Sequence, residues 1–225
     1  MPAVTWYFDF VSPYAYLQST RLCRLPESET LEIRPVLFAG LLAHWDTKGP
    51  AEVPPKKAFT YRQVAWRAKR DGIPYRLPRH HPFNPLRALR LVIARANDRQ
   101  TAQTLFRQIW VDGLLPDDDE DWRRMTAELG FKNADQEIAA PSVKAELTEN
   151  GRNAIAAGVF GVPTFTADGH LFWGDDALDF VLDWLGDPEL LDDDSMRRLP
   201  LPSPAVDPAL TSGQAMATPV PPRPQ

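Results

Sequence analysis

Residues 4–17 read V-T-W-Y-F-D-F-V-S-P-Y-A-Y-L, and this stretch decides the fold. The run from Val4 to Val11 is almost wholly apolar, aromatic or β-branched, which predicts a buried strand. A helical pattern begins at Ser12-Pro13, since serine is a favourable N-cap and proline at the first helical position gives up no hydrogen bond. The first N–H groups of that helix and the positive end of its dipole therefore meet where the strand ends, which predicts an anion-binding site.

The next residues predict a crossover to a second strand. We expect the helix to run to about Leu25, and a strand over Leu31 to Phe38 in which Pro35 marks the end or an edge. This is a right-handed βαβ unit. Cys23 is interpreted as a small buried core residue, with a reactive thiol as the alternative.

The middle of the chain predicts a surface loop followed by helices. The loop is the proline-rich segment Thr47 to Lys56, and a helix over Lys57 to Asp71 ends at Gly72. Residues 73–86 predict an extended segment broken by four prolines. Further helices are expected at about Leu86–Asn97, Thr101–Asp112, Glu120–Leu129, Asp135–Ala139 and Ser142–Ala157.

Some side chains of this region invite a functional interpretation. Trp66, Trp110 and Trp122 occur at helical spacing and are interpreted as core residues. A metal site at His80 and His81 is disfavoured, because adjacent residues on an extended segment point to opposite sides and no further ligand lies at suitable spacing.

The C-terminal part predicts a hairpin, a helix and a tail. Strands are expected over Val162–Ala167 and Leu171–Trp173, joined by the turn Asp168-Gly169, before a final helix that opens at Asp175-Asp176. From Pro188 onward the chain holds nine prolines, which predicts a disordered or polyproline-II tail.

Composition narrows the class of protein. The chain of 225 residues has 44% hydrophobic residues and a net charge of −5 with no basic cluster, which argues against nucleic acid as a partner. No apolar run is long enough to span a bilayer and no signal-type segment opens the chain, so neither a membrane nor export is expected. A single cysteine excludes an intrachain disulfide framework, and a reducing, cytoplasmic compartment is expected.

The Ser-Pro-Tyr start and the later Gly-Val-Pro-Thr resemble the DsbA-like branch of the thioredoxin fold, and more narrowly the 2-hydroxychromene-2-carboxylate isomerases and kappa-class glutathione transferases. The resemblance implies an α/β thioredoxin-like fold with a large all-α domain inserted after the second strand. The implied domains are residues 1–39 and 151–187 for the thioredoxin-like part, 40–150 for the helical insertion and 188–225 for the tail.

The resemblance also implies glutathione as the cofactor. Redox-active relatives carry Cys-x-x-Cys where this chain has Ser12 and Ala15, and a dithiol cycle needs two sulfurs. The reactive sulfur is therefore expected to come from glutathione, with Ser12 donating a hydrogen bond to its thiolate at the helix start beside Pro13.

Further glutathione contacts follow from matching the motifs of those families. Val162, before an expected cis peptide bond to Pro163, would pair with the cysteinyl backbone through a free N–H and C=O. Asp175 and Asp176 are expected at the γ-glutamyl end. The glycyl carboxylate is expected near Thr47 and Lys48, where kappa-class relatives have Asn-Lys, so that Thr47 departs from the pattern.

The implied reaction is a reversible addition of the thiolate to opened 2-hydroxychromene-2-carboxylate or a related aromatic carboxylate, a step of aromatic catabolism. Phe83 is expected to contact the aromatic ring and Asn84 to donate or accept a hydrogen bond; as the alternative, Phe83 is a core residue and Asn84 a turn residue. A homodimer is expected. Two other functions stay open: a kappa-like glutathione transferase or peroxidase, and a non-catalytic peptide-binding module that has no glutathione affinity.

Overall fold

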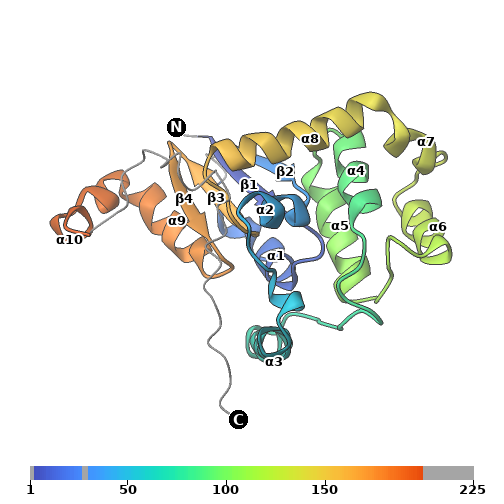
Figure 1. Ribbon diagram of the computed structural model, residues 1–225, viewed down its shortest axis with the longest axis horizontal. Helices are drawn as coiled ribbons and strands as arrows, with labels where there is room; N and C mark the ends of the chain where they lie inside the picture. The colour runs from blue at the N-terminus through green and yellow to red at the C-terminus, as the bar shows by residue number, and fades with distance from the viewer. Residues whose placement is uncertain (1–2, 27–29, 200–225) are drawn as a thin grey trace, which may run out of the picture. The chain divides into compact units, whose positions relative to one another are not determined.

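The computed structural model describes residues 3–26 and 30–199 and contains a four-stranded mixed sheet (Figure 1). The strand order is β2-β1-β3-β4. Strands β1 (Val4–Phe8) and β2 (Leu31–Pro35) are parallel, whereas β3 (Thr164–Ala167) is antiparallel to both β1 and β4 (His170–Trp173). The predicted order of strands, with helices between the second and the third, is confirmed.

Strand β1 is central because both of its faces are covered. On one face the Trp6 ring stacks on Phe8, with ring centroids 4.4 Å apart, and both contact Phe106 of the helical insertion. On the other face Tyr7 packs into a cluster that includes Leu41 and Val162. Burial of both faces explains why β1 reads as a continuous apolar run rather than an alternating one.

The crossover helix α1 (Pro13–Ser19) is shorter than predicted. Thr20 caps it, and the chain continues as the 3₁₀ turn η1 (Leu22–Arg24) rather than as α-helix. Cys23 is exposed in this turn, so its interpretation as a buried core residue is wrong. Periodicity along the sequence does not distinguish a 3₁₀ turn, which rotates side chains by a different angle, from one more turn of α-helix.

Seven α-helices lie between β2 and β3 in the described part of the chain. The first, α2, is absent from the sequence prediction, which extended the strand to Phe38. Its cap explains the error: the Phe38 N–H donates to the Asp9 carboxylate at 2.8 Å, a contact made across 29 residues. The helices are α2 (Phe38–His44), α3 (Pro54–Asp71), α4 (Leu86–Ala94), α5 (Arg99–Trp110), α6 (Asp119–Glu128), α7 (Ala134–Ala139) and α8 (Pro141–Ala156), with the 3₁₀ turn η2 (Pro50–Glu52) before α3.

Helix α3 begins three residues earlier than predicted and ends as predicted, at Gly72 with φ 66°. Within it Trp66 is 57% exposed, so its interpretation as a core residue is wrong. Trp110 and Trp122, in α5 and α6, are buried as expected.

The insertion shares its core with the sheet. The Trp110 indole donates to the Phe10 carbonyl at 3.0 Å, and the Phe106 ring lies 4.5 Å from that of Phe10. Helix α1 packs against both α3 and α5. The residues that follow β1 are therefore packed against helices of the insertion.

The hairpin turn between β3 and β4 has Asp168 and Gly169 at φ 46° and 81°, as its Asp-Gly sequence predicts. Helix α9 (Ala177–Gly186) packs on β3 and β4, and the boundary between two compact units falls directly after it. The division of the first unit into the two predicted domains stays a prediction.

The second unit begins at Asp187 and is described as far as residue 199. It contains the 3₁₀ helix η3 (Pro188–Asp192) and the short α10 (Asp194–Arg197), so the prediction of a structureless tail is wrong for these residues. The rest of the predicted tail, residues 200–225, lies outside the described residues.

Within residues 3–26 and 30–199, no helix is long and apolar enough to cross a membrane. Over the same residues no cluster of three or more histidine, cysteine, aspartate or glutamate side chains is arranged to hold a metal ion.

Candidate active site

Ser12 caps the N-terminus of α1, as its place before Pro13 predicts. Its backbone is extended, with φ −87° and ψ 113°, and its Oγ accepts a hydrogen bond from the Ala15 N–H at 3.2 Å. The Ser12 N–H donates to the Asp9 carbonyl at 3.1 Å, which closes the turn between β1 and α1. The hydroxyl is thereby held at the helix start, next to the first N–H groups of α1.

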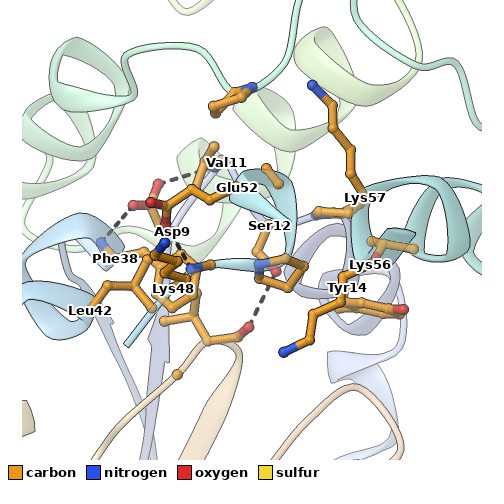
Figure 2. A pocket seen from close by; sticks show the side chains of 18 of the residues that line it. Asp9, Val11, Ser12, Tyr14, Phe38, Leu42, Lys48, Glu52, Lys56 and Lys57 are labelled. Atoms are coloured by element: carbon orange, nitrogen blue, oxygen red, sulfur yellow. Dashed lines mark hydrogen bonds between the residues drawn. The ribbon is translucent and has the colours of Figure 1, made fainter. Parts of the chain in front are cut away.

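A cavity of about 750 Å³ opens at Ser12, and we call it the Ser12 cavity (Figure 2). Its wall is built by the turn after β1, α2, the loop and 3₁₀ turn before α3, the first half of α3, the segment before α4, the segment before β3 and the end of β4. Six residues expected from the sequence to form the site line it: Ser12, Pro13, Thr47, Lys48, Phe83 and Val162.

The cavity combines apolar walls with cationic side chains. Figure 2 shows Lys48 on one side of Ser12 and Lys56 and Lys57 on the other, and all three line the cavity. Much of the remaining wall is apolar, with Leu42 and Phe59 as examples. This combination suits a ligand that has an apolar body and anionic groups.

The peptide bond between Val162 and Pro163 is cis, as the resemblance implied. The Val162 carbonyl, however, is not free as expected, because it accepts a hydrogen bond from the Ser12 hydroxyl at 3.3 Å. Val162 lines the cavity, whereas Pro163 is buried behind it. A ligand that accepts a hydrogen bond from the Ser12 hydroxyl therefore has to displace the Val162 carbonyl as its acceptor.

Asp175 has partners that sequence reasoning missed. Its carboxylate is buried between two guanidinium groups: it forms an ion pair with Arg21, and its Oδ2 lies 2.6 Å from Arg67 Nη2. A contact of this carboxylate with the γ-glutamyl end would therefore have to compete with two arginines. Asp176 is exposed and, like Asp175, lies outside the lining of the Ser12 cavity.

Phe83 lines the Ser12 cavity, whereas its neighbour Asn84 does not. Phe83 is 5% exposed and lines the cavity, so it is at once a core residue and part of the wall. Asn84 lies outside the lining, and its Oδ1 accepts a hydrogen bond from the Leu86 N–H at 3.1 Å. Asn84 therefore lies in the segment before α4, where its side chain bonds to the first N–H of that helix.

Asp9 belongs to the cavity wall, although sequence reasoning missed it. Its side chain is fully buried, and its oxygens accept hydrogen bonds from the Val11 N–H at 3.0 Å and the Phe38 N–H at 2.8 Å (Figure 2). Burial raises its pKa to about 7, while these N–H donors act in the opposite direction. The signal in the sequence was a carboxylate inside an apolar strand.

Tyr61 and His81 were also missed as cavity residues, and both line the wall. The Tyr61 hydroxyl lies 2.8 Å from His81 Nδ1, and His81 Nε2 lies 2.7 Å from the Val11 carbonyl. No sequence signal joins a helix residue to a histidine 20 positions later, because the contact depends on how α3 packs.

Comparison with known proteins places these features in a family. The DSBA-like thioredoxin domain matches residues 3–186. The 2-hydroxychromene-2-carboxylate isomerase of Sphingobium xenophagum is 29% identical over 194 residues, covering 82% of this chain and 98% of that protein. Glutathione S-transferase kappa 2 of Caenorhabditis elegans is 27% identical over 207 residues, covering 82% of this chain and 92% of that protein.

Solved structures agree on the fold. A 2-hydroxychromene-2-carboxylate isomerase superposes with a TM-score of 0.73 at 23% identity, covering 82% of this chain and 94% of that one. The family match runs from β1 to the end of α9 and so includes the sheet, the insertion and every residue that lines the Ser12 cavity. This chain therefore belongs to the DSBA-like thioredoxin family, in which it is similar to 2-hydroxychromene-2-carboxylate isomerases and to kappa-class glutathione transferases.

Proposed function

We propose that this protein binds glutathione in the Ser12 cavity and uses its thiolate to isomerise 2-hydroxychromene-2-carboxylate or a related aromatic carboxylate. The observation that carries the proposal is a serine hydroxyl, in place of a thiol, held at the start of α1 in the wall of a large cavity. The chain has alanine at position 15, where a second redox cysteine would stand. The reactive sulfur is then the ligand's.

The relatives support glutathione as that ligand. The kappa-class relatives are glutathione transferases by name, and this chain is 25–27% identical to two of them. A structure of the cytosolic disulfide reductase DsbM from Pseudomonas aeruginosa with GSH has the same fold, with a TM-score of 0.55.

The proposed chemistry begins with ionisation of the glutathione thiol. On binding, the Ser12 hydroxyl turns its hydrogen from the Val162 carbonyl, 3.3 Å away, to the sulfur. This hydrogen bond and the N–H groups of α1 favour the thiolate. A pKa depression of about one to two units corresponds to about 1.4 kcal/mol per unit and makes the thiolate the major species. The thiolate then adds to the exocyclic double bond of the opened substrate, the resulting single bond rotates, and elimination returns glutathione.

Except at the γ-glutamyl end, the proposed glutathione contacts use residues that line the cavity. The Val162 backbone, beside Pro163, would bind the cysteinyl part of glutathione, and Thr47 and Lys48 its glycyl carboxylate. For the γ-glutamyl end we keep Asp176, because the Asp175 carboxylate already pairs with two arginines.

For the second substrate we propose Phe83 as the ring contact, since it lines the cavity, and not Asn84. The lysines Lys56 and Lys57 are suitably placed for the substrate carboxylate. We also propose that the protein is a homodimer, which light scattering can test. We propose a cytoplasmic location as well.

Replacing Ser12 with alanine tests the proposal. We expect the pKa of bound glutathione, followed by its ultraviolet absorbance, to rise by about one to two units in S12A, because the thiolate loses its hydrogen bond. Turnover at neutral pH should fall with the thiolate fraction.

S19A is the matched control for this experiment. Ser19 is also buried in α1, but its hydroxyl bonds to the Tyr16 carbonyl and does not line the cavity. If S12A and S19A leave the ionisation curve of glutathione in the same place, Ser12 does not stabilise the thiolate.

A kappa-like transferase or peroxidase is the second candidate, favoured by 27% identity to a kappa transferase over nearly the same span. Comparing turnover of 2-hydroxychromene-2-carboxylate with that of chloro-dinitrobenzene and cumene hydroperoxide separates the two. The third possibility, a non-catalytic peptide-binding module, predicts no thermal shift with glutathione.

A further inference from the structure

Three residues from separate parts of the chain form a hydrogen-bonded series in the wall of the Ser12 cavity. Tyr61 comes from α3, His81 from the segment before α4, and Val11 from the turn directly before Ser12. The Tyr61 hydroxyl lies 2.8 Å from His81 Nδ1, and His81 Nε2 lies 2.7 Å from the Val11 carbonyl oxygen. The series thus connects the hydroxyl of a cavity residue to the backbone next to Ser12.

The chemistry of the partners determines where the protons are. A carbonyl oxygen only accepts hydrogen bonds, so His81 Nε2 carries a hydrogen and donates it to Val11. In the neutral imidazole Nδ1 is then the acceptor, and Tyr61 donates its hydroxyl hydrogen to it. This leaves the lone pairs of the Tyr61 oxygen available to accept a hydrogen bond from a ligand in the cavity.

The surroundings of His81 keep it neutral. Burial lowers its pKa below the ordinary value, and the nearby Lys57 and His80 charges lower it further. The hydrogen bond to the Val11 carbonyl acts in the opposite direction and raises the pKa. Lys57 also donates to the His81 carbonyl at 3.0 Å. The titratable groups that face His81 are Tyr61 and Lys57 of α3 and its neighbour His80, while Phe83 and Trp110 present only rings.

We propose that Tyr61 is a further catalytic residue, which takes a proton from a hydroxyl group of the second substrate, and that His81 acts through it as the proton acceptor. The proposal rests on the isomerase function proposed above and adds a role that the thiolate does not fill. It also narrows the substrate class to aromatic carboxylates that carry an ionisable hydroxyl, such as the cyclic hemiketal 2-hydroxychromene-2-carboxylate.

The proton transfer opens the ring of this hemiketal. The hemiketal hydroxyl gives its proton to the Tyr61 oxygen while Tyr61 passes its own to His81 Nδ1. The O–H electron pair forms the new C=O bond, and the ring C–O bond breaks with its pair on the phenolate oxygen. Tyr61 then protonates the phenolate and recovers its hydrogen from His81. One proton leaves and one returns, so no external acid, base or oxidant is required.

The test compares Y61F, H81Q and the control H80Q in the full chain. Y61F keeps the ring and removes the hydroxyl; H81Q can still accept from Tyr61 and donate to Val11, but it cannot hold an extra proton. His80 is exposed, outside the cavity lining, and paired with Asp117, so H80Q controls for loss of a histidine in the same segment.

We expect Y61F and H81Q to lower kcat for 2-hydroxychromene-2-carboxylate by about 10² or more, the usual size of general acid–base catalysis, while both keep the thermal shift with glutathione. Wild-type kcat should fall as pH drops through the pKa of His81, since a protonated Nδ1 accepts nothing, and this acidic limb should disappear in H81Q. H80Q should stay within about twofold of wild type in kcat.

Two results overturn the proposal: Y61F with kcat within about threefold of wild type, or H81Q that retains the acidic limb. Y61F is the decisive variant if H81Q does not fold, because Tyr61 is only partly buried. Failure of the proposed function looks different: the wild type itself then shows no thermal shift with glutathione or no isomerisation.

Discussion

Asp9 shows how much one side chain contributes to the site. It is the fully buried carboxyl of the turn after β1, and its two oxygens accept N–H groups of Val11 and Phe38. These two bonds join the turn that carries Ser12 to the start of α2, so one residue aligns two parts of the cavity wall. Such an arrangement needs two acceptor oxygens, which only a carboxylate side chain supplies at this size.

The raised pKa of Asp9, about 7, links stability to pH. Between about pH 4 and pH 7 the folded chain keeps a proton that the unfolded chain has lost, so stability from this group falls as pH rises, by about 1.4 kcal/mol per unit. We expect D9N to lack this slope. Urea unfolding of both proteins at several pH values in this range measures it.

The asparagine also loses one of the two hydrogen bonds, because its NH2 group cannot accept from an N–H, and this loss is independent of pH. The test therefore follows the difference between the free energies of unfolding of the wild type and D9N, and asks how this difference changes with pH. That difference should move in favour of D9N as pH rises. A difference that stays constant across the range contradicts the assigned pKa.

At the level of elements, α3 is held in place by a buried charge cluster. Asp175, before α9, pairs with Arg21, after α1, and with Arg67 of α3. Because α3 carries Tyr61, Lys56 and Lys57 of the cavity wall, this cluster connects the β4–α9 turn to the shape of the site. Removing one partner leaves the remaining buried charges uncompensated.

We expect D175N to lower the free energy of unfolding by about 3 to 5 kcal/mol, as for other broken buried ion pairs, and to weaken glutathione binding because α3 is released. D179N is the matched control. Asp179 pairs with Arg24 at 2.6 Å but is 63% exposed at its side chain, so its loss should cost about 0 to 1 kcal/mol. Equal losses in urea unfolding would show that the Asp175 cluster does not hold α3.

At the level of the whole molecule, the site depends on the first compact unit alone. All cavity residues lie between Asp9 and Trp173, and both this unit and the family match end at Gly186. The insertion belongs to the same unit, because Phe106 and Trp110 pack on the strand and turn that precede α1. Loosening of α5 is therefore expected to affect Ser12 as well.

Truncation after Gly186 tests the independence of the first unit. We expect the melting temperature of residues 1–186 to stay within about 2 °C of the full chain, because all buried hydrophobic side chains of the described residues lie before residue 187. The thermal shift caused by glutathione should be equal in both. A truncated chain that binds glutathione more weakly would show that residues after 186 contribute to the site.

The sequence by itself determined the features that depend on neighbouring residues. Ser12-Pro13 predicted the helix start, Gly72 a helix end, and Asp168-Gly169 the hairpin turn, because caps and turns are satisfied within a few residues. The apolar runs predicted the strands, and the resemblance at both ends of the sheet predicted the order of elements and the position of Ser12.

Only the tertiary structure decided what faces what. Cys23 and Trp66 are exposed although their apolar character predicted burial, and the Asp175 carboxylate is committed to two arginines. The cap of α2 by Asp9 and the series from Tyr61 through His81 to Val11 join residues that are 20 to 70 positions apart. Such contacts depend on the packing of helices against the sheet, and neither local propensity nor periodicity carries information about which distant polar groups that packing brings together.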